Sequence, residues 1–494
     1  MNTLLIYPQW PDTYWSFRHA LPFQGKRAAY PPLGLITVAS MLPAHWNKRL
    51  VDSSVRSLTD ADLQWADIAM LSGMLIHKPE LIQILERCRK AGVRTVIGGP
   101  VTSSVEELRH HADHVVIGEA EDLMPELVHD LENHCARRVY HATELPGLDK
   151  TPLPDLRLIK PRYYSTMAVQ YSRGCPFNCE FCDIIEIYGR RPRTKPVDQV
   201  IAELEQLYAY KWRGSVFFVD DNFIGNKRNV KQLLPVVAEW NRRKGMPFQF
   251  FTEASINLAD DEDLLRMMRD AGFFRVFVGI ETPDEESLKV AQKMQNTKRN
   301  LLDCVRHIQA YGIEVMAGFI VGFDSDTEEV FDKQVDFIQK SAIPLAMVGL
   351  LQALPGTQLY RRLVSEGRLV DYGDGDNMST ALNFLPKMDA QRLVEGYRSI
   401  LKRIYDHEAY YERVREFLKR YNPTHRVHHE LADYVALVRS MLKQGLFTNG
   451  RIAYWKLFFE ALTQYPRAFG TAITLAIMGY HFQTITERVC DTES

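Results

Sequence analysis

The sequence predicts an α/β protein of three parts: an N-terminal doubly wound (Rossmann-like) domain, a central partial (β/α)6 barrel and a helical C-terminal domain. In two separate stretches, short apolar runs alternate with helical patterns, which is typical of parallel sheets covered by helices. From about residue 369 this alternation stops and amphipathic helical patterns follow. The expected bounds are 1–145 for the first domain, 146–165 for a linker, 166–368 for the barrel and 369–494 for the helical domain.

The composition is that of an ordinary folded protein, with 46% hydrophobic and 25% charged residues in a chain of 494. A net charge of −2 gives no sign of non-specific nucleic-acid binding. Four of the seven cysteines are scattered, as in proteins of the reducing cytoplasm, and the N-terminus shows no secretion signal. No apolar run reaches the roughly 18 residues that cross a bilayer. We therefore expect a cytoplasmic protein without a transmembrane segment, in which 469–482 is a buried or interfacial helix.

Five strands are expected in the first domain, at 4–7, 49–51, 68–72, 95–97 and 114–117. A helix at 79–91 would lie between two of them and end at Gly92. Folds of this kind bind ligands at the carboxyl ends of the strands. Small residues follow three of these ends and would let a ligand approach the backbone: Ser72 and Gly73, then Gly98, Gly99 and Pro100, then Gly118 with Glu119. The spacing alone is explained almost equally well by plain turns in a domain that binds nothing.

The linker contains Pro146, Pro152, Pro154 and Pro161, which disfavour a helix through it. Six strands are expected after it, at 167–171, 215–219, 248–252, 276–280, 315–321 and 346–351. Helices such as 261–271 lie between them, and six repeats rather than eight indicate an open, partial barrel. Polar residues follow several strands at the barrel edge where active sites lie: Asp220, Asp221, Asn222, Glu253 and Glu281. Each of them is also explained as a helix N-cap.

Three cysteines, Cys175, Cys179 and Cys182, form one tight loop after the first barrel strand. Three thiolates leave one iron of a four-iron cluster without a protein ligand, and this open iron makes a cluster reactive. Glycine before the first cysteine and proline after it favour a sharp bend. A zinc site is the alternative, but zinc usually takes four ligands and the sequence has no second cysteine pair. The remaining cysteines stand apart from this loop: Cys88, Cys135, Cys304 and Cys490.

The cysteine loop, with Phe181 before its last cysteine, resembles the radical S-adenosylmethionine (SAM) superfamily. The resemblance implies a [4Fe-4S] cluster on the three cysteines, which binds SAM and cleaves it to a 5′-deoxyadenosyl radical. Where that family often has Gly-Gly-Glu, this chain reads Phe218-Val-Asp-Asp-Asn222, so carboxylates remain and the glycines do not. The SAM-binding residues implied are Phe181, Asp220, Asp221, Asn222, Glu253, Glu281, Gly318, Ile320 and Gly322.

The first domain resembles the cobalamin-binding domain of cobalamin-dependent radical SAM enzymes, through Tyr30-Pro-Pro-Leu-Gly-Leu35 and the two later glycine loops. The cobalamin-binding residues implied are Tyr30, Pro32, Gly34, Ser72, Gly73, Gly98, Gly99, Pro100, Gly118 and Glu119. The signature Asp-x-His-x-x-Gly is missing, and His77 does not stand in that context. We therefore expect cobalt without a histidine lower ligand; a domain that has lost the cofactor is the alternative.

Over nearly its full length the chain resembles the group of hopanoid C-2 methylases and tetraether-lipid ring synthases, including Tyr465-Pro-Arg467 near the end. This resemblance implies methylation of an unactivated carbon in a hydrophobic, lipid or hopanoid-like substrate. A radical cyclase or rearrangement enzyme with the same cofactors is one alternative. A non-catalytic, cluster-binding sensor is the other.

The basic stretch 189–195 would pair with an anionic group, or dock an electron donor such as flavodoxin or ferredoxin, unless it is only a solvated loop. Helices are expected at 391–419 and 430–443. Their tyrosines would roof the site or, more often for tyrosine, pack in the core: Tyr397, Tyr405, Tyr410 and Tyr411. A lipid substrate would also be compatible with peripheral contact to a membrane.

Overall fold

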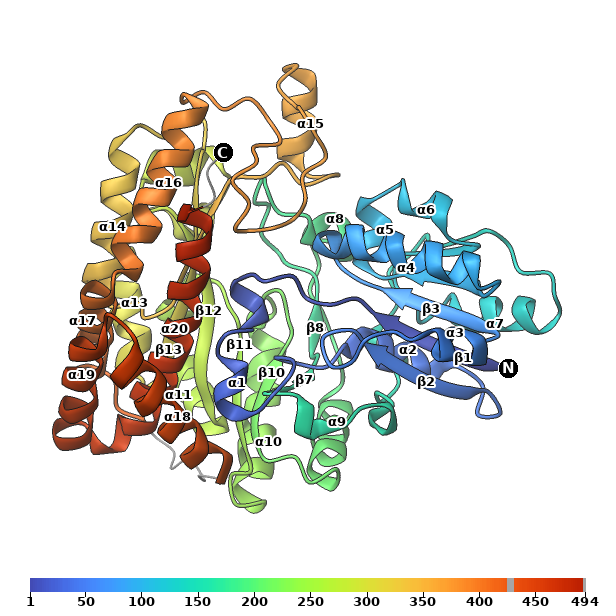
Figure 1. Ribbon diagram of the computed structural model, residues 1–494, viewed down its shortest axis with the longest axis horizontal. Helices are drawn as coiled ribbons and strands as arrows, with labels where there is room; N and C mark the ends of the chain where they lie inside the picture. Colours follow the sequence, from blue (N-terminus) through green and yellow to red (C-terminus); the bar gives the residue numbers. More distant parts are fainter. Residues whose placement is uncertain (424–430, 492–494) are drawn as a thin grey trace.

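The computed structural model describes residues 1–423 and 431–491 and contains two six-stranded parallel sheets and a C-terminal layer of helices (Figure 1). The N-terminal sheet lies at the right of the view, the barrel sheet at the centre, and the C-terminal helices cover the barrel at the left. This arrangement confirms the predicted α/β fold class and the order of its three parts. The exact domain bounds stay a prediction.

The N-terminal sheet has the strand order β2-β1-β3-β4-β5-β6, with every pair parallel. The strands are β1 (Asn2–Tyr7), β2 (Asn47–Asp52), β3 (Ile68–Ser72), β4 (Arg94–Gly98), β5 (His114–Ile117) and β6 (Val139–His141). The five predicted strands are confirmed, whereas β6 was not predicted because it is short and exposes both Val139 and His141. The order reverses between β1 and β3, so a ligand crevice is expected outside the carboxyl ends of these two strands.

Helices cover both faces of this sheet, in two separate apolar cores. They are α2 (Leu33–Met41), α3 (Asp60–Trp65), α4 (Lys78–Lys90), α5 (Pro100–Ser104), α6 (Leu108–His111) and α7 (Met124–Glu132). The linker holds only short 3-10 turns, as its prolines predict: Leu148–Lys150, Leu156–Leu158 and Pro161–Tyr163.

The barrel sheet has the order β14-β13-β12-β11-β10-β7 and is parallel throughout. Its strands are β7 (Met167–Val169), β10 (Gly214–Phe218), β11 (Phe248–Glu253), β12 (Phe273–Glu281), β13 (Glu314–Val321) and β14 (Ala346–Leu350). All six predicted strands are confirmed. The outer helices are α9 (Val197–Ala209), α10 (Lys227–Arg243), α11 (Glu262–Ala271), α12 (Glu285–Val290), α13 (Leu301–Ala310), α14 (Glu329–Ser341) and α15 (Gln358–Ser365). Shorter pieces are β8 (Ser172–Arg173), α8 (Ile184–Tyr188), β9 (Arg193–Thr194), Ile256–Asp260 and Met294–Asn296.

The concave side of the barrel is lined by aromatic rings. Phe218 and Phe250 point outward and pack with each other beside Phe248 and Trp240, so their strand neighbours Phe217 and Phe251 face the opposite side. The latter two rings stack at a centroid distance of 4.5 Å.

An N-terminal segment inserts into this concave side. It contains a 3-10 turn, Tyr14–Ser16, and α1 (Leu21–Gln24). The ring of Trp15 lies 6.5 Å from that of Phe217 and 5.1 Å from that of Phe277. A sheet open between β7 and β14 therefore has its interior partly filled by residues from the first domain.

The C-terminal helices are α16 (Ala390–Tyr405), α17 (His407–Leu418), α18 (Leu431–Phe447), α19 (Arg451–Gln464) and α20 (Phe469–Asp491), with a 3-10 turn at Pro466–Ala468. The single helix expected at 391–419 is wrong, because the chain breaks at Asp406. Its extended backbone (ψ 139°) ends α16, and its carboxylate caps α17 by accepting from the amides of Glu408 and Ala409.

The helix expected at 430–443 runs to Phe447, and its expected first residue lies outside the described residues. The expected apolar helix 469–482 is the first part of α20, and most of its side chains are buried. In the described part of the chain, no helix has the length and apolar character needed to cross a membrane.

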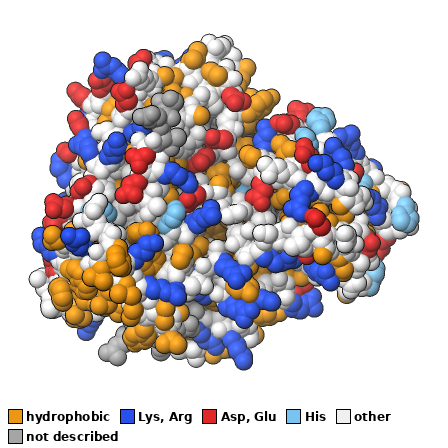
Figure 2. Space-filling model, viewed as in Figure 1, with side chains coloured by type: hydrophobic (Ala, Val, Ile, Leu, Met, Phe, Trp, Pro, Cys, Tyr) orange, Lys and Arg blue, Asp and Glu red, His pale blue; other side chains and the backbone are white. Residues whose placement is uncertain are grey.

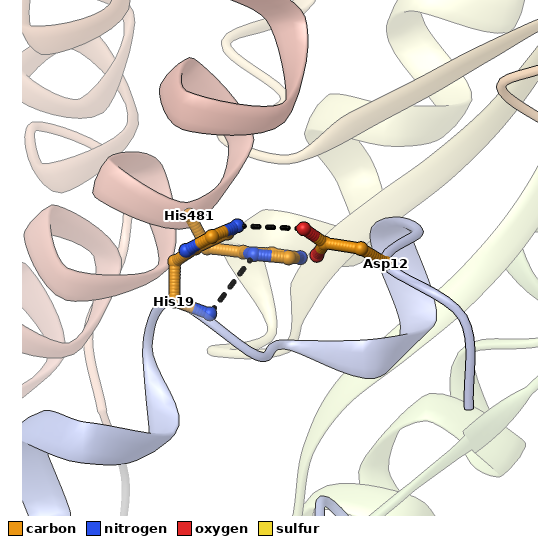
Figure 3. Close-up of side chains that lie close together, drawn as sticks. All are labelled: Asp12, His19 and His481. Atoms are coloured by element: carbon orange, nitrogen blue, oxygen red, sulfur yellow. Dashed lines mark hydrogen bonds and ion pairs between the residues drawn. The ribbon is translucent and has the colours of Figure 1, made fainter. Parts of the chain in front are cut away.

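A cluster of polar side chains ties α20 to the N-terminal segment (Figure 3). His19 Nε2 lies 2.9 Å from Asp12 Oδ2, and the His19 amide donates to His481 Nδ1 at 3.4 Å. The other ring nitrogen of His481 donates to backbone carbonyl oxygens of the segment, and Arg488 pairs with Asp12 at 2.8 Å. The three side chains are close enough for a metal site. Because Arg488 already neutralises Asp12 and both nitrogens of His481 are engaged, we interpret the cluster as a structural tie.

The tight crossing of α17 and α20 generates a stability prediction. A Cβ atom at Gly479 would overlap the ring of Tyr410, whose hydroxyl donates to the carbonyl of Leu475 at 2.6 Å. We expect Gly479→Ala to lower Tm by roughly 2–8 °C, because overpacking of this size costs about 1–3 kcal/mol.

The matched control is Gly34→Ala in α2, where an added Cβ meets nothing within 4 Å. Alanine is the better helix former by roughly 0.5–1 kcal/mol, so this variant should keep or raise Tm. Differential scanning calorimetry of both variants makes the comparison, and equal Tm values would contradict the packing argument.

Candidate active site

The three cysteines of the predicted cluster lie in a loop at the carboxyl edge of the barrel sheet, directly after β8. Gly174 has φ +89°, and a Cβ there would lie 2.8 Å from the carbonyl oxygen of Gly189. The amide of Cys175 donates to that same carbonyl at 3.2 Å, and the amide of Cys182 donates to Cys179 O at 3.2 Å. The glycine is required because the loop passes so close to its neighbour, and the loop gathers the cysteines into one turn.

Two amide side chains donate to the cysteine sulfurs. Asn222 Nδ2 lies 3.7 Å from Cys175 Sγ, and Gln295 Nε2 lies 3.5 Å from Cys179 Sγ. Hydrogen bonds to sulfur are one means by which a protein sets the potential of an iron–sulfur cluster. The other four cysteines lie on α4, after α7, on α13 and on α20, so none of them belongs to this loop. The donor set therefore fits a four-iron cluster with one iron left for a non-protein ligand.

Asp220, predicted to bind SAM, holds the cluster loop in this structure. Its side chain is only 1% exposed and accepts hydrogen bonds from the backbone amides of Tyr171 and Ser172. Burial raises the pKa of this carboxyl to about 7. The carboxylate thus fixes the turn that leads into the cysteines.

Asp221 and Glu253 form an acidic pair at the ends of neighbouring strands. Burial raises the pKa of Asp221 to about 7 and that of Glu253 to about 8, and the charge of Asp221 adds to the shift of Glu253. A cationic group bound here would relieve both effects, because it favours the ionised carboxylates. The pair therefore suits the ammonium group that SAM carries.

Glu281, also predicted to bind SAM, makes an ion pair at 2.6 Å with Lys293, a residue that the sequence did not single out. Glu281 has φ +64° at an irregular point of the β12–β13 pairing. A Cβ at Gly279 would lie 2.7 Å from Lys293 Nζ, so glycine makes room for the pair. Lys293 Nζ also stands 5.9 Å from the ring centroid of Phe181. The pair places a positive charge beside the cluster loop.

The three predicted positions on the fifth barrel strand lie near Phe181. Ile320 and Phe181 belong to one apolar cluster, and the ring of Phe181 lies 6.1 Å from that of Phe323. A Cβ at Gly318 would lie 3.0 Å from the ring of Phe277. Gly322, with φ +110°, starts the turn after β13 and donates its amide to Asp326. These contacts fit an apolar wall beside the cluster loop.

The predicted cobalamin residues surround the crevice at the carboxyl edge of the N-terminal sheet. Gly99 and Gly118 have positive φ values, and a side chain on either would collide with a neighbouring loop, at Ser72 and Ala142 respectively. Pro32 precedes α2 and Pro100 begins α5, while Gly34 faces open space. The glycines thus shape closely packed loops that leave the strand ends accessible.

Tyr30 connects this crevice with the barrel. Its ring lies 5.9 Å from that of Trp10 and 6.0 Å from that of Phe217. Burial raises its pKa, and the charges of Tyr7 and Glu253 raise it further. The predicted cobalamin and SAM sites therefore face each other across Tyr30.

His77 lies in the same crevice, in the turn after β3. It is 1% exposed, its Nδ1 accepts from the amide of Met74 at 3.1 Å, and its Nε2 has no hydrogen-bond partner among the described residues. Burial against the rings of Tyr7 and Trp10 lowers its pKa to about 4, so the imidazole is neutral. A buried, unpaired nitrogen at a strand end fits a crevice built to hold a bound group.

Glu119, predicted to bind cobalamin, joins the two domains in this structure. It pairs with Arg173, the residue just before Gly174, and with Arg193. Glu121 pairs with Arg173 at 2.8 Å. The N-terminal domain thus fixes the cluster loop, and neither arginine was predicted for this role.

Much of the basic stretch 189–195 is likewise engaged inside the protein. Arg193 pairs with Glu119, and the buried Lys195 pairs with Glu203. Arg190 and Arg191 are exposed beside the cluster loop. Of the basic residues in the stretch, only Arg190 and Arg191 are exposed.

Three family models match the chain: a B12 binding domain over residues 27–128, the radical SAM superfamily over residues 169–338 and a domain of unknown function, DUF4070, over residues 357–494. The relative named "Uncharacterized methyltransferase sll1242", from Synechocystis sp., is 41% identical over 99% of this chain and 92% of its own length. "Hopanoid C-2 methylase" from Rhodopseudomonas palustris is 37% identical over 93% of this chain and 89% of its own length.

The structure of the radical SAM methyltransferase TsrM from Kitasatospora setae, solved with cobalamin and a [4Fe-4S] cluster bound, matches with a TM-score of 0.62. The match covers 97% of this chain and 99% of that chain, at 14% sequence identity. It shows that the two chains share a fold.

The raised pKa of Glu253 predicts how stability depends on pH when SAM is absent. The folded state keeps a proton on Glu253 up to pH about 8, whereas the unfolded chain loses it near pH 4.5. Stability from this group is therefore lost as the pH rises through that window. At pH 9 we expect Glu253→Gln to have a higher Tm than the wild type, because its free energy of unfolding is larger by about 1–4 kcal/mol. At pH 4.5 the two proteins should have the same Tm.

Thermal unfolding of the SAM-free protein at pH 4.5, 7 and 9 measures this difference. The control is Glu106→Gln, an exposed position in the first domain, which should follow the wild type at each pH. A Tm difference for Glu253→Gln that does not change with pH would contradict the burial argument.

Proposed function

The chain belongs to the cobalamin-dependent radical SAM methylase family, and we propose that it methylates an unactivated carbon of a hydrophobic, hopanoid-like lipid. Its cofactors are a [4Fe-4S] cluster, SAM and cobalamin. When bound, the cluster supplies the electron that cleaves SAM, and cobalamin carries the methyl group. The protein's own residues bind these groups, orient the substrate and exclude water.

Cys175, Cys179 and Cys182 hold the cluster in this proposal, and Asp221 and Glu253 accept hydrogen bonds from the SAM ammonium group. Asp220 and Asn222 act through the loop, since one binds its backbone amides and the other donates to Cys175 Sγ. The apolar side chains around Phe181 form the surface for the adenine.

The crevice outside β1 and β3, with its glycine loops, would hold cobalamin. Tyr30 lies on the barrel side of this crevice, next to Phe217 and Glu253. His77 Nε2, in the turn after β3, is buried and has no hydrogen-bond partner among the described residues. A substrate bound inside the barrel would then lie between the two cofactors.

The observation that carries the substrate class is the aromatic lining of the barrel. Trp15, Phe217, Phe251 and Phe277 present ring faces and edges where a soluble metabolite would need hydrogen bonds. The name of the R. palustris relative, a hopanoid methylase, agrees with an apolar polycyclic substrate. Both relatives named above are described as methyl-transferring enzymes, which favours methylation over cyclisation.

We further propose that the protein works in the cytoplasm, where a flavodoxin or ferredoxin reduces it. The described cysteines form no disulfide, as expected in a reducing compartment. The exposed Arg190 and Arg191 beside the cluster loop suit an acidic electron donor. Because polycyclic lipids reside in membranes, we also propose peripheral contact with a bilayer.

The proposed reaction predicts its by-products. Anaerobically purified protein, loaded with both cofactors and given reductant, SAM and a hopanoid substrate, should form one S-adenosylhomocysteine and one 5′-deoxyadenosine per methylated product. Mass spectrometry with methyl-labelled SAM measures all three compounds. Product formed without S-adenosylhomocysteine would favour the cyclase alternative, and intact SAM would favour the sensor.

The cluster assignment predicts a sharp division among the cysteines. Alanine at position 175, 179 or 182 should reduce iron from about four atoms per chain to below one. SAM cleavage should disappear in the same variants. Alanine in place of Cys135, Cys304 or Cys490 should leave both unchanged. Iron and sulfide quantitation with an absorption spectrum provides the measurement, and a full cluster in Cys179→Ala would refute the assignment.

A further inference from the structure

The helices α18 and α19 present an unusually apolar outer surface. Of the 22 most exposed large hydrophobic side chains in the described residues, ten lie on these two helices or between them. Phe447 is 81% exposed and Ile452 is 79% exposed. Figure 2 shows hydrophobic side chains gathered at the lower left, over the end of the molecule where Figure 1 places these helices. We name this surface the α18–α19 face; it consists of Leu431, Tyr434, Val435, Val438, Leu442, Leu446, Phe447, Ile452, Phe459 and Leu462.

The members of the face are spaced so that they form one continuous surface. On α18 they recur every three or four residues, and on α19 Ile452, Phe459 and Leu462 are spaced by seven and three, so each helix has one apolar side. Trp455 joins the two sides, because its Nε1 donates to the carbonyl of Gly445 at 2.9 Å and its ring stacks on Phe459. Contiguous apolar patches of this kind mark interaction sites in water-exposed proteins.

The charges around the face are mainly positive. The exposed charged side chains of the two helices are Arg439, Lys443, Arg451 and Lys456. Arg439 also donates to backbone carbonyls of α1, and Lys443 lies over the ring of Tyr480, whereas Arg451 and Lys456 border the face. Of the acidic residues on the two helices, Glu460 is paired with Arg415 and Asp433 is partly buried. An apolar side bordered by lysine and arginine is the pattern of helices that lie in the interface of an anionic bilayer. Two copies of the same surface would bring these positive charges together, which disfavours a dimer.

A large cavity opens beside the same face. It has a volume of about 880 Å³ and is walled by α18 on one side and by the N-terminal segment on the other. Leu442 and Phe447 belong both to the α18–α19 face and to the wall of this cavity. Trp10 and Ala29 line its other wall, and Ala29 precedes Tyr30 at the barrel mouth. A hydrophobic molecule leaving a bilayer at this face would meet the cavity before the active site.

We propose that the α18–α19 face docks onto the surface of an anionic lipid bilayer and that the adjoining cavity receives the hydrophobic substrate from it. Docking is inferred only from the exposure, spacing and charge of the side chains on the α18–α19 face. The role of docking in substrate uptake rests on the proposed lipid methylation. The apolar side chains enter the acyl boundary while Arg451 and Lys456 reach the phosphate groups.

Vesicle flotation of the full chain tests docking without any catalysis. The probes are vesicles of phosphatidylcholine alone and vesicles with about one third phosphatidylglycerol, each at low and high salt. We expect the protein to float with the anionic vesicles and to dissociate as salt rises. Phe447→Glu with Ile452→Glu, and likewise Leu446→Glu with Ile452→Glu, should weaken binding at least about tenfold, because two large apolar side chains no longer enter the acyl boundary. Arg451→Glu with Lys456→Glu should weaken it on anionic vesicles only.

The matched control is Val370→Glu with Leu385→Glu, two exposed apolar side chains on a distant loop near α15, which should bind vesicles as the wild type does. Absence of wild-type binding to either vesicle would overturn the proposal. So would binding that survives Phe447→Glu with Ile452→Glu. A wild-type dimer in analytical ultracentrifugation that this double variant converts to monomer, without vesicle binding, would assign the face to a second copy instead.

The methylation assay separates failure of docking from failure of the proposed function. With substrate embedded in vesicles, Leu446→Glu with Ile452→Glu, two residues of the face outside the cavity wall, should lose product but keep iron content and SAM cleavage. With the same substrate in detergent it should recover product. A wild type that floats with vesicles but methylates no lipid would retain the docking surface and refute the substrate class.

Discussion

Two carboxylates of the first domain hold the arginine that leads into the cluster cysteines, and much of the site depends on this contact. Glu119 and Glu121 both bind Arg173, and Glu119 also binds Arg193 on the returning strand of the same loop. These groups are almost fully shielded from water, so breaking either pair would leave an uncompensated buried charge. The cluster loop can therefore take its position only when both domains are folded and docked. The ion pairs make the two-domain arrangement a condition of the chemistry.

The strands were predictable because each is a short apolar run with a small or polar residue at its end. The strand β6 was not predicted because two of its three residues face solvent. The break between the two helices at Asp406 was not predicted because the amphipathic pattern continues on both sides of it. Within such a pattern, a capping aspartate cannot be distinguished from an ordinary exposed charge. Local patterns thus report burial well and report changes of direction poorly.

At the site, sequence motifs identified positions but not their partners. Asp220 and Glu281 stand at the strand ends where the motif places them, yet one binds backbone amides and the other binds Lys293. Lys293 and Gln295 come from a loop after α12 that carries no motif, and only the folded chain brings them to the cysteines. Residues that act by supporting others leave little trace in a single sequence, because their role depends on contacts between distant segments.

The tie between Asp12, His19 and His481 joins the first residues of the chain to the last helix. During synthesis the N-terminal segment leaves the ribosome several hundred residues before α20 does. The N-terminal segment can therefore be held in the open side of the barrel only after α20 has been made. Until then the segment that carries Trp15 into the aromatic interior lacks its tie to α20. The filling of the barrel interior is thus fastened late, by a helix that lies far along the chain from the segment it holds.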